Sequence, residues 1–202
     1  MQPGLCGEGA ARSDAGTTLI EVLTVVAVAA VLTSLSAPLA ATVADAGRAR
    51  NAAAFIASRF RLARIDAVNS GRNVAVVFDL VGSHWQVRLC RDDSGNGVRR
   101  SEIASGTDLC FDGPHEFRAL FPGMEIDVDS QLVGPAGEPG NPDPVRLGAS
   151  DLASFSPAGT CTSGSVFLRS THGQQFAVRI AGVTGRLRVF RYDAGAGAWM
   201  QF

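Results

Sequence analysis

One stretch near the N-terminus constrains the fold of this chain more than any other feature. From Val22 to Ala44 the sequence runs for 23 residues without a charge and is rich in Val, Leu and Ala. As an α-helix this run would be about 35 Å long, enough to cross a hydrocarbon core of about 30 Å. We therefore predict a membrane-spanning helix followed by a separate domain. The alternative is a secreted domain that begins at Gly47, because Ala44-Asp45-Ala46 has the spacing of a signal-peptidase site, although a secretory apolar core is shorter, about 7–15 residues.

Glu21 lies where the apolar run begins. A carboxylate inside lipid costs several kcal/mol unless it is paired or lies near the interface. Two interpretations follow from its position. Either the headgroup region accommodates Glu21, or the side chain binds a partner such as the amino terminus of a neighbouring chain.

The segment around this glutamate carries a family resemblance. Gly16-Thr17-Thr18-Leu19-Ile20-Glu21-Val22-Leu23 resembles the processing signature of type IV prepilins. The resemblance implies a leader over residues 1–16, cleavage by a prepilin peptidase between Gly16 and Thr17, and N-methylation of Thr17. It also implies that Glu21 acts in filament assembly by pairing with a neighbour's terminal amine. Pro38 stands where many pilins carry a helix-kinking proline.

Beyond Ala44 the pattern becomes amphipathic. We predict that the helix of residues 17–44 continues over residues 45–71 and ends at Asn69-Ser70-Gly71, with Gly71 as its C-terminal cap. Apolar residues at helical spacing form the face expected to be buried: Phe55, Ile56, Leu62, Ile65 and Val68.

Residues 72–202 have the pattern of short strands and turns. We predict a hairpin of residues 73–79 and 84–90, and a second pair, 116–121 with 124–129, around Pro122-Gly123. A Gly- and Pro-rich loop is expected over residues 134–144, and four further strands over residues 152–156, 165–169, 175–181 and 186–192. The predicted fold class is therefore α+β, a long transmembrane and then amphipathic helix packed on an antiparallel sheet.

Segments of this region widen the resemblance. Residues 63–72, Phe155-Ser156-Pro157-Ala158-Gly159 and Gly185-Arg186-Leu187-Arg188 are similar to the FimT/GspH group of minor pilins and pseudopilins. The resemblance implies a structural subunit of a type II secretion pseudopilus or type IV pilus, single-pass in the inner membrane with a periplasmic C-terminal head. The implied partners are other pilins or pseudopilins, the prepilin peptidase, the inner-membrane assembly platform and membrane lipid.

The cysteines and one acidic loop suggest further sites. Cys90 and Cys110 flank a single loop and are the expected disulfide, which leaves Cys161 over, while Cys6 belongs to the leader. No cysteine pair has zinc-ligand spacing. The loop from Asp92 to Asn96 has two readings, a turn-rich loop or a calcium site, and it lacks the alternating acids and bidentate glutamate of an EF-hand.

The basic residues are unevenly distributed. The chain has 18 arginines, no lysine and a net charge of −1, which excludes a globally basic nucleic-acid binder. Residues 79–151 hold 13 acids and six arginines, whereas residues 169–191 hold five arginines and no acid. In the predicted last strand Arg186 and Arg188 share one face, where they would bind phosphates or pair with acids of this head or of the next subunit.

The chemistry of the remaining motifs is limited. The Gly-Arg-x-Arg sequence at Arg186 and Arg188 looks like the motif that FimT-type minor pilins use to bind DNA during uptake, which gives an alternative function with DNA as partner. His84, His115 and His172 are scattered and match no catalytic motif. We therefore expect a protein that is not an enzyme and needs no cofactor or metal.

Overall fold

The computed structural model describes residues 18–201, except for the side chains of residues 35–42. It divides into two units, the first ending at Thr42 and the second beginning at Val43. One helix, α1 (Leu19–Ser70), contributes to both units, and Gly71 follows it with a positive φ of 67° and its N–H bonded to the Ala67 carbonyl. This is the predicted glycine cap.

In the second unit α1 forms the centre of the core. Its buried residues recur every three or four positions, so they form one continuous face. Six are alanines, and the small side chains let both sheets approach the helix closely: Ala49, Ala52, Ala53, Ile56, Ala57, Phe60, Ala63 and Ala67. Phe60 contacts Phe78 of one strand and Phe155 of another, with ring centroids 6.1 and 6.2 Å apart.

The predicted buried face of this part of α1 is largely wrong. Ile56 is buried and Phe55 packs against the core, but Leu62, Ile65 and Val68 are 40%, 57% and 54% exposed. At about 100° per residue Leu62 lies about 200° around the helix from Phe60. Larger side chains therefore lie on the outer face, and the alanines lie inside.

The first sheet has the strand order β3-β2-β1-β6, with every pair antiparallel. Its strands are β1 (Val74–Val81), β2 (His84–Arg91), β3 (Leu109–Glu116) and β6 (Leu152–Phe155). β1 and β2 form the hairpin that the sequence predicts, in the register Val81 to His84. Val74, Val76 and Phe78 point toward α1 and join the main core.

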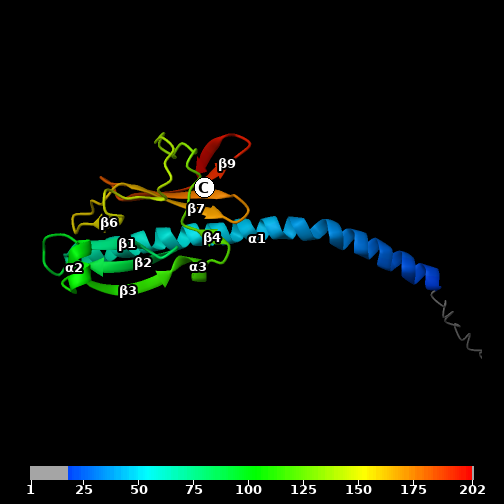
Figure 1. Ribbon diagram of the computed structural model, residues 1–202, viewed down its shortest axis with the longest axis horizontal. Coiled ribbons are helices and arrows are strands. Elements are labelled where there is room, and N and C mark those ends of the chain that lie inside the picture. Colours follow the sequence, from blue (N-terminus) through cyan, green and yellow to red (C-terminus); the bar gives the residue numbers. More distant parts are fainter. Residues whose placement is uncertain (1–17, 202) are drawn as a thin grey trace, which may run out of the picture. The chain divides into compact units, whose positions relative to one another are not determined.

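The second sheet has the order β10-β9-β8-β7-β4, and β5 also pairs with β7. Its strands are β4 (Met124–Glu125), β5 (Val145–Arg146), β7 (Gly164–Ser170), β8 (Gln175–Ala181), β9 (Arg186–Asp193) and β10 (Ala198–Gln201). One face contributes Val166, Leu168 and Val178 to the core around α1. Figure 1 shows both sheets beside the C-terminal half of α1.

Two short helices complete the second unit, α2 (Arg100–Ser105) and α3 (Phe117–Leu120). The predicted pair of strands 116–121 and 124–129 is wrong, because residues 117–120 form α3. β4 pairs instead with β7. Buried Phe117, packed beside Phe121 at a centroid distance of 5.3 Å, stabilises this helical turn.

The predicted fold class also needs correction. With about 34% strand and 31% helix the chain is a mostly β fold rather than α+β. Among the described residues no helix combines the length and apolar character needed to cross a membrane. The predictions of a transmembrane helix and of a single-pass inner-membrane protein are therefore wrong. Those predictions were based on the absence of charge. The run also contains the hydroxyl groups of Thr24, Thr33 and Ser34, which donate hydrogen bonds to carbonyls of α1 and make the run less apolar.

Candidate functional site

The β8–β9 hairpin brings three arginines together on the face of the second sheet that points away from α1. Arg179 of β8 lies directly opposite Arg188 of β9, and Ala181 lies opposite Arg186. Because side chains alternate along a strand, Leu187 packs toward the core while Arg186 and Arg188 point the other way. We call Arg179, Arg186 and Arg188 the arginine cluster.

The arginine cluster lines a shallow depression of about 340 Å³, together with Ala181 and Thr184. Arg186 and Arg188 are exposed, and neither guanidinium makes an ion pair or hydrogen bond with any residue in the described range. Two guanidinium groups free to bind are suited to phosphate or carboxylate oxygens, which they contact bidentately.

A tight turn holds the two strands in this register. Gly185 has φ of 62°, and its N–H donates to the Ala181 carbonyl at 2.7 Å. A Cβ at Gly185 would lie 3.0 Å from Nη1 of Arg64 on α1, so the turn also passes close to the helix. Glycine therefore meets a conformational and a steric requirement next to the arginine cluster.

Acidic side chains form ion pairs with two arginines of this sheet, one inside the arginine cluster and one outside it. Arg179 forms an ion pair with Glu138, and Arg169 forms one with Asp127 at 3.3 Å. The predicted alternative, pairing with acids of the same head, thus accounts for these two arginines. It does not account for Arg186 or Arg188 among the described residues.

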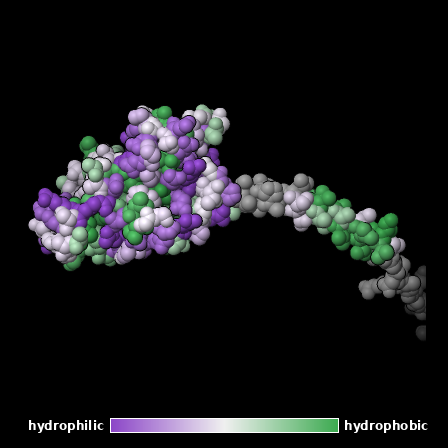
Figure 2. Space-filling model, in the orientation of Figure 1, coloured by the Kyte–Doolittle hydropathy of each residue, from purple (hydrophilic) through white to green (hydrophobic). Residues whose placement is uncertain are grey.

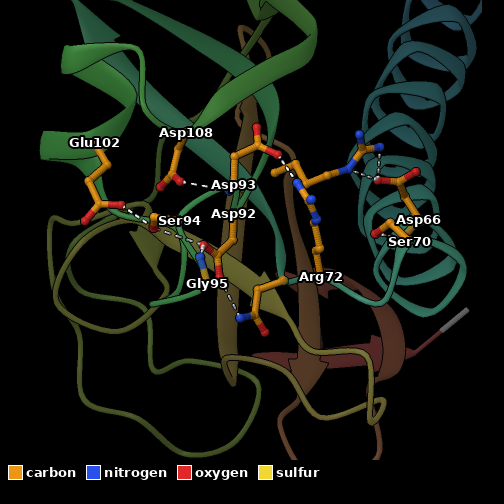
Figure 3. A network of polar contacts seen from close by, with 11 residues as sticks. Asp66, Ser70, Arg72, Asp92, Asp93, Ser94, Gly95, Glu102 and Asp108 are labelled. Carbon is orange, nitrogen blue, oxygen red and sulfur yellow. Dashed lines mark hydrogen bonds and ion pairs between the residues drawn. The ribbon is translucent and has the colours of Figure 1, made fainter.

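The Asp92 loop, residues 92–97, forms a closed network of hydrogen bonds (Figure 3). The buried Asp92 carboxylate accepts bonds from Gly95 N–H at 2.6 Å, Gly97 N–H at 2.8 Å and Asn73 Nδ2 at 3.0 Å. Ser94 donates at 3.2 Å to Asp92 and at 2.7 Å to Glu102. Burial raises the pKa of Asp92, but these hydrogen bonds outweigh it and hold the pKa below 3.8.

The loop from Asp92 to Asn96 has two interpretations, a turn-rich loop or a calcium site, and its hydrogen bonds favour the turn-rich loop. N–H and O–H donors take up the Asp92 oxygens that a cation would need. Within residues 18–201 no group of three or more His, Cys, Asp or Glu side chains is arranged to hold a metal ion. The geometry is that of a turn-rich loop closed on a buried carboxylate.

The cysteines lie in two different environments. A disulfide joins Cys90 of β2 to Cys110 of β3, across a sequence separation of 20 residues. Cys161 is a free thiol of intermediate exposure. Burial raises its pKa above 9.0, although the nearby Arg64 charge acts in the opposite direction.

The residues predicted from the prepilin resemblance lie in or near the first unit. Gly16 and Thr17 lie outside the described residues. Glu21 is in the first turn of α1, and its N–H donates to the Thr18 carbonyl at 3.0 Å. Pro38 falls within α1, but its side chain is outside the described set.

The histidines lie apart, on different elements. His115 contacts Asp112 at 3.0 Å, and His84 lies 3.5 Å from Ser83. His172 contacts Asp45, a fully buried carboxylate of α1 that also accepts a 2.7 Å hydrogen bond from Ser170. The alternative signal-peptidase sequence Ala44-Asp45-Ala46 therefore includes a residue fixed in the core.

Sequence reasoning missed two side chains of functional interest, Glu138 and Asp45. Each binds a partner far away in the chain, Glu138 from a loop and Asp45 from α1, and no local sequence signal indicates either pairing. Comparisons with protein-family models, with curated proteins and with solved structures find no match for the chain.

Proposed function

We propose that the chain is a structural subunit of a pilin-like filament, a minor pilin or pseudopilin assembled through the N-terminal part of α1. The proposal depends on one observation: every large apolar side chain in the described stretch from Leu19 to Leu32 is exposed. Their exposed fractions range from 49% to 82%. Figure 2 colours this part of the helix mostly green, hydrophobic.

Apolar side chains on all sides of a helix favour association with other helices. Burying one large aliphatic side chain contributes about 1.5–3 kcal/mol, so covering even a few of these residues would drive assembly. Glu21 is the only charge in this stretch, and a bundle that buries it must also supply a partner. The prepilin resemblance implies that partner, the terminal amine of a neighbouring subunit after cleavage before Thr17.

Photo-cross-linking of the full chain in its native cell tests this function. A photoreactive residue at Val25 should form cross-links between copies of the chain or to related subunits, whereas one at Ser101, exposed on α2, should not. Glu21→Gln should reduce the Val25 cross-links. Equal cross-linking at both positions, or a mature N-terminus at Gly47 rather than Thr17, would contradict the proposal.

A second function, DNA binding at the arginine cluster, is supported by a separate observation. Arg186 and Arg188 are exposed, adjacent and without a carboxylate partner in the described residues, although acids are abundant elsewhere in the chain. Guanidinium pairs of this kind bind phosphates, and the affinity then depends strongly on salt. The resemblance of Gly185-Arg186-Leu187-Arg188 to the FimT motif points the same way.

Fluorescence anisotropy of the full chain with a short DNA duplex tests the second function. Arg186→Gln with Arg188→Gln should weaken binding and reduce the slope of log affinity against log salt by about two. The matched control is Arg61→Gln with Arg191→Gln, which removes two exposed arginines outside the arginine cluster. Equal losses in both double variants, or no binding by the wild type, would contradict DNA binding.

A further inference from the structure

Glu138 occupies one end of the arginine cluster. Its Oε1 forms the ion pair with Nη1 of Arg179, which also contacts Ser165 Oγ at 3.3 Å. Glu138 therefore lies where an oxygen of an anionic ligand would bind this arginine. Arg186 and Arg188, on the neighbouring strand, have no such occupant among the described residues.

The surrounding loop holds Glu138 in place. Gly134 N–H donates to the Glu138 carbonyl at 2.7 Å, and Ala136 N–H donates to its Oε2 at 2.9 Å. Trp199 of β10 donates through Nε1 to the Val133 carbonyl at 2.7 Å, which ties the loop to the edge of the sheet. Burial raises the pKa of Glu138, but the backbone hydrogen bonds and Arg179 outweigh it, so the pKa lies below 4.5 and the carboxylate is charged at neutral pH.

The pairing has an electrostatic reason. Arg179 and Arg188 are direct cross-strand neighbours, and like charges in that position repel. The Glu138 carboxylate reduces this repulsion in the protein without ligand. A ligand that binds all three arginines must displace it, so its affinity is reduced by the fraction of molecules in which Glu138 is bound.

The geometry points to Glu138 as a built-in competitor that tunes the arginine cluster for polyanions. A ligand with several adjacent phosphates contacts Arg186 and Arg188 first and then displaces Glu138 from Arg179, whereas a single phosphate cannot bind all three. This inference rests on the second proposed function, anion binding at the arginine cluster. It assigns Glu138 a role in specificity and affinity, with no contact to the ligand.

Replacement of Glu138 in the full chain tests the inference. Glu138→Gln should bind a short DNA duplex about threefold to tenfold more tightly, the range expected when a partly exposed ion pair no longer competes. Its salt slope should steepen by about one, because the negative charge of Glu138 no longer offsets the positive charge of Arg179 beside the phosphates. Inorganic phosphate should compete weakly with DNA for both proteins.

Asp93→Asn is the charge-matched control. It also removes one negative charge and frees one arginine, Arg72, but this pair lies on the Asp92 loop and not in the arginine cluster. We expect its DNA affinity to change less than twofold, as an order of magnitude for an exposed charge far from the ligand. An equal gain in DNA affinity for Asp93→Asn and Glu138→Gln would show that the gain comes from net charge alone, and it would overturn the inference.

A double variant separates the role of Glu138 from a loss of structure. Arg179→Gln should weaken DNA binding little in the wild type, because the phosphate contact that it removes forms only at the expense of the ion pair with Glu138. In the Glu138→Gln background the same substitution should cancel the whole gain. Glu138→Asp keeps the charge but shortens the side chain, so it should give a smaller gain. It also serves as a second variant in case Glu138→Gln does not fold.

The outcomes separate the inference from the function on which it rests. If Glu138→Gln gains no affinity while Arg186→Gln and Arg188→Gln abolish binding, only the inference fails. If no protein binds DNA, the second function itself fails.

Discussion

Removing the Asp92 carboxylate is the sharpest test of how the second unit is held together. In Asp92→Ala the Gly97 N–H and the Asn73 amide, both half-buried, lose a charged acceptor at 2.8 and 3.0 Å. A hydrogen bond to a charged group contributes about 1.5–3 kcal/mol. Gly95 and Ser94 are exposed, so water can replace the bonds that they lose. Taking the lower figure for the two half-buried donors gives a loss of about 3 kcal/mol.

The assay is urea denaturation of the full chain followed by tryptophan fluorescence, with calorimetry as a second measurement. For a domain of this size a loss of about 3 kcal/mol lowers Tm by about 10 °C. Asp93→Ala is the matched control, because Asp93 is the adjacent acid and pairs with Arg72, which is 53% exposed. Such an exposed pair contributes about 0–1 kcal/mol.

The pH dependence gives the same prediction an independent readout. The pKa of Asp92 is lower in the folded protein, so its contribution to stability is complete above pH 3.8 and is lost as the pH falls through the folded pKa. The wild type and Asp92→Ala should therefore converge in strong acid. The reasoning is refuted if Asp92→Ala and Asp93→Ala have equal stability, or if calcium raises the Tm of the wild type, because a cation needs the oxygens assigned to the N–H donors.

Three further predictions concern the core and its cross-links, each measured by the free energy of unfolding. Cys110→Ser should cost about 3 kcal/mol, because the disulfide closes a loop across a separation of 20 residues. Asp45→Ala should cost about 1–3 kcal/mol, since it leaves the buried Ser170 hydroxyl without the carboxylate that accepts its hydrogen bond. Ala57→Leu should cost about 2 kcal/mol by overpacking a fully enclosed site, whereas Ile65→Ala on the exposed face should change stability by less than about 0.5 kcal/mol.

Features set by local chemistry could be predicted from the sequence. Gly71 ends α1 because a residue without Cβ adopts the positive φ of the cap. The β1–β2 hairpin follows from two runs rich in β-branched and aromatic residues around Gly82, and residues 134–144 contain no strand before β5 begins at Val145. In each case the signal lies within a few residues of the feature.

Features set by distant contacts could not be predicted. Met124 and Glu125 pair with β7, more than forty residues away, so the turn at Pro122-Gly123 gave no information about their partner. Similarly, alternation places Arg186 and Arg188 on one face, but the opposing Arg179 depends on the register of two strands. Glu138 reaches Arg179 across 41 residues, from a loop with no periodic pattern.

The prediction of which face of α1 is buried was wrong because large apolar side chains were expected inside. Hydrophobic gain per residue favours burying Leu62 and Ile65, but two sheets must pack against the same helix face, and alanines such as Ala53 and Ala57 permit the closest approach. Phe60 and Ile56 then fill the remaining space between the sheets. The larger residues are left on the outer face, as they are between Leu19 and Leu32. Exposed apolar residues thus occur in both units on one helix, and contact with further copies of α1 would bury those of the first unit without disturbing the core of the second.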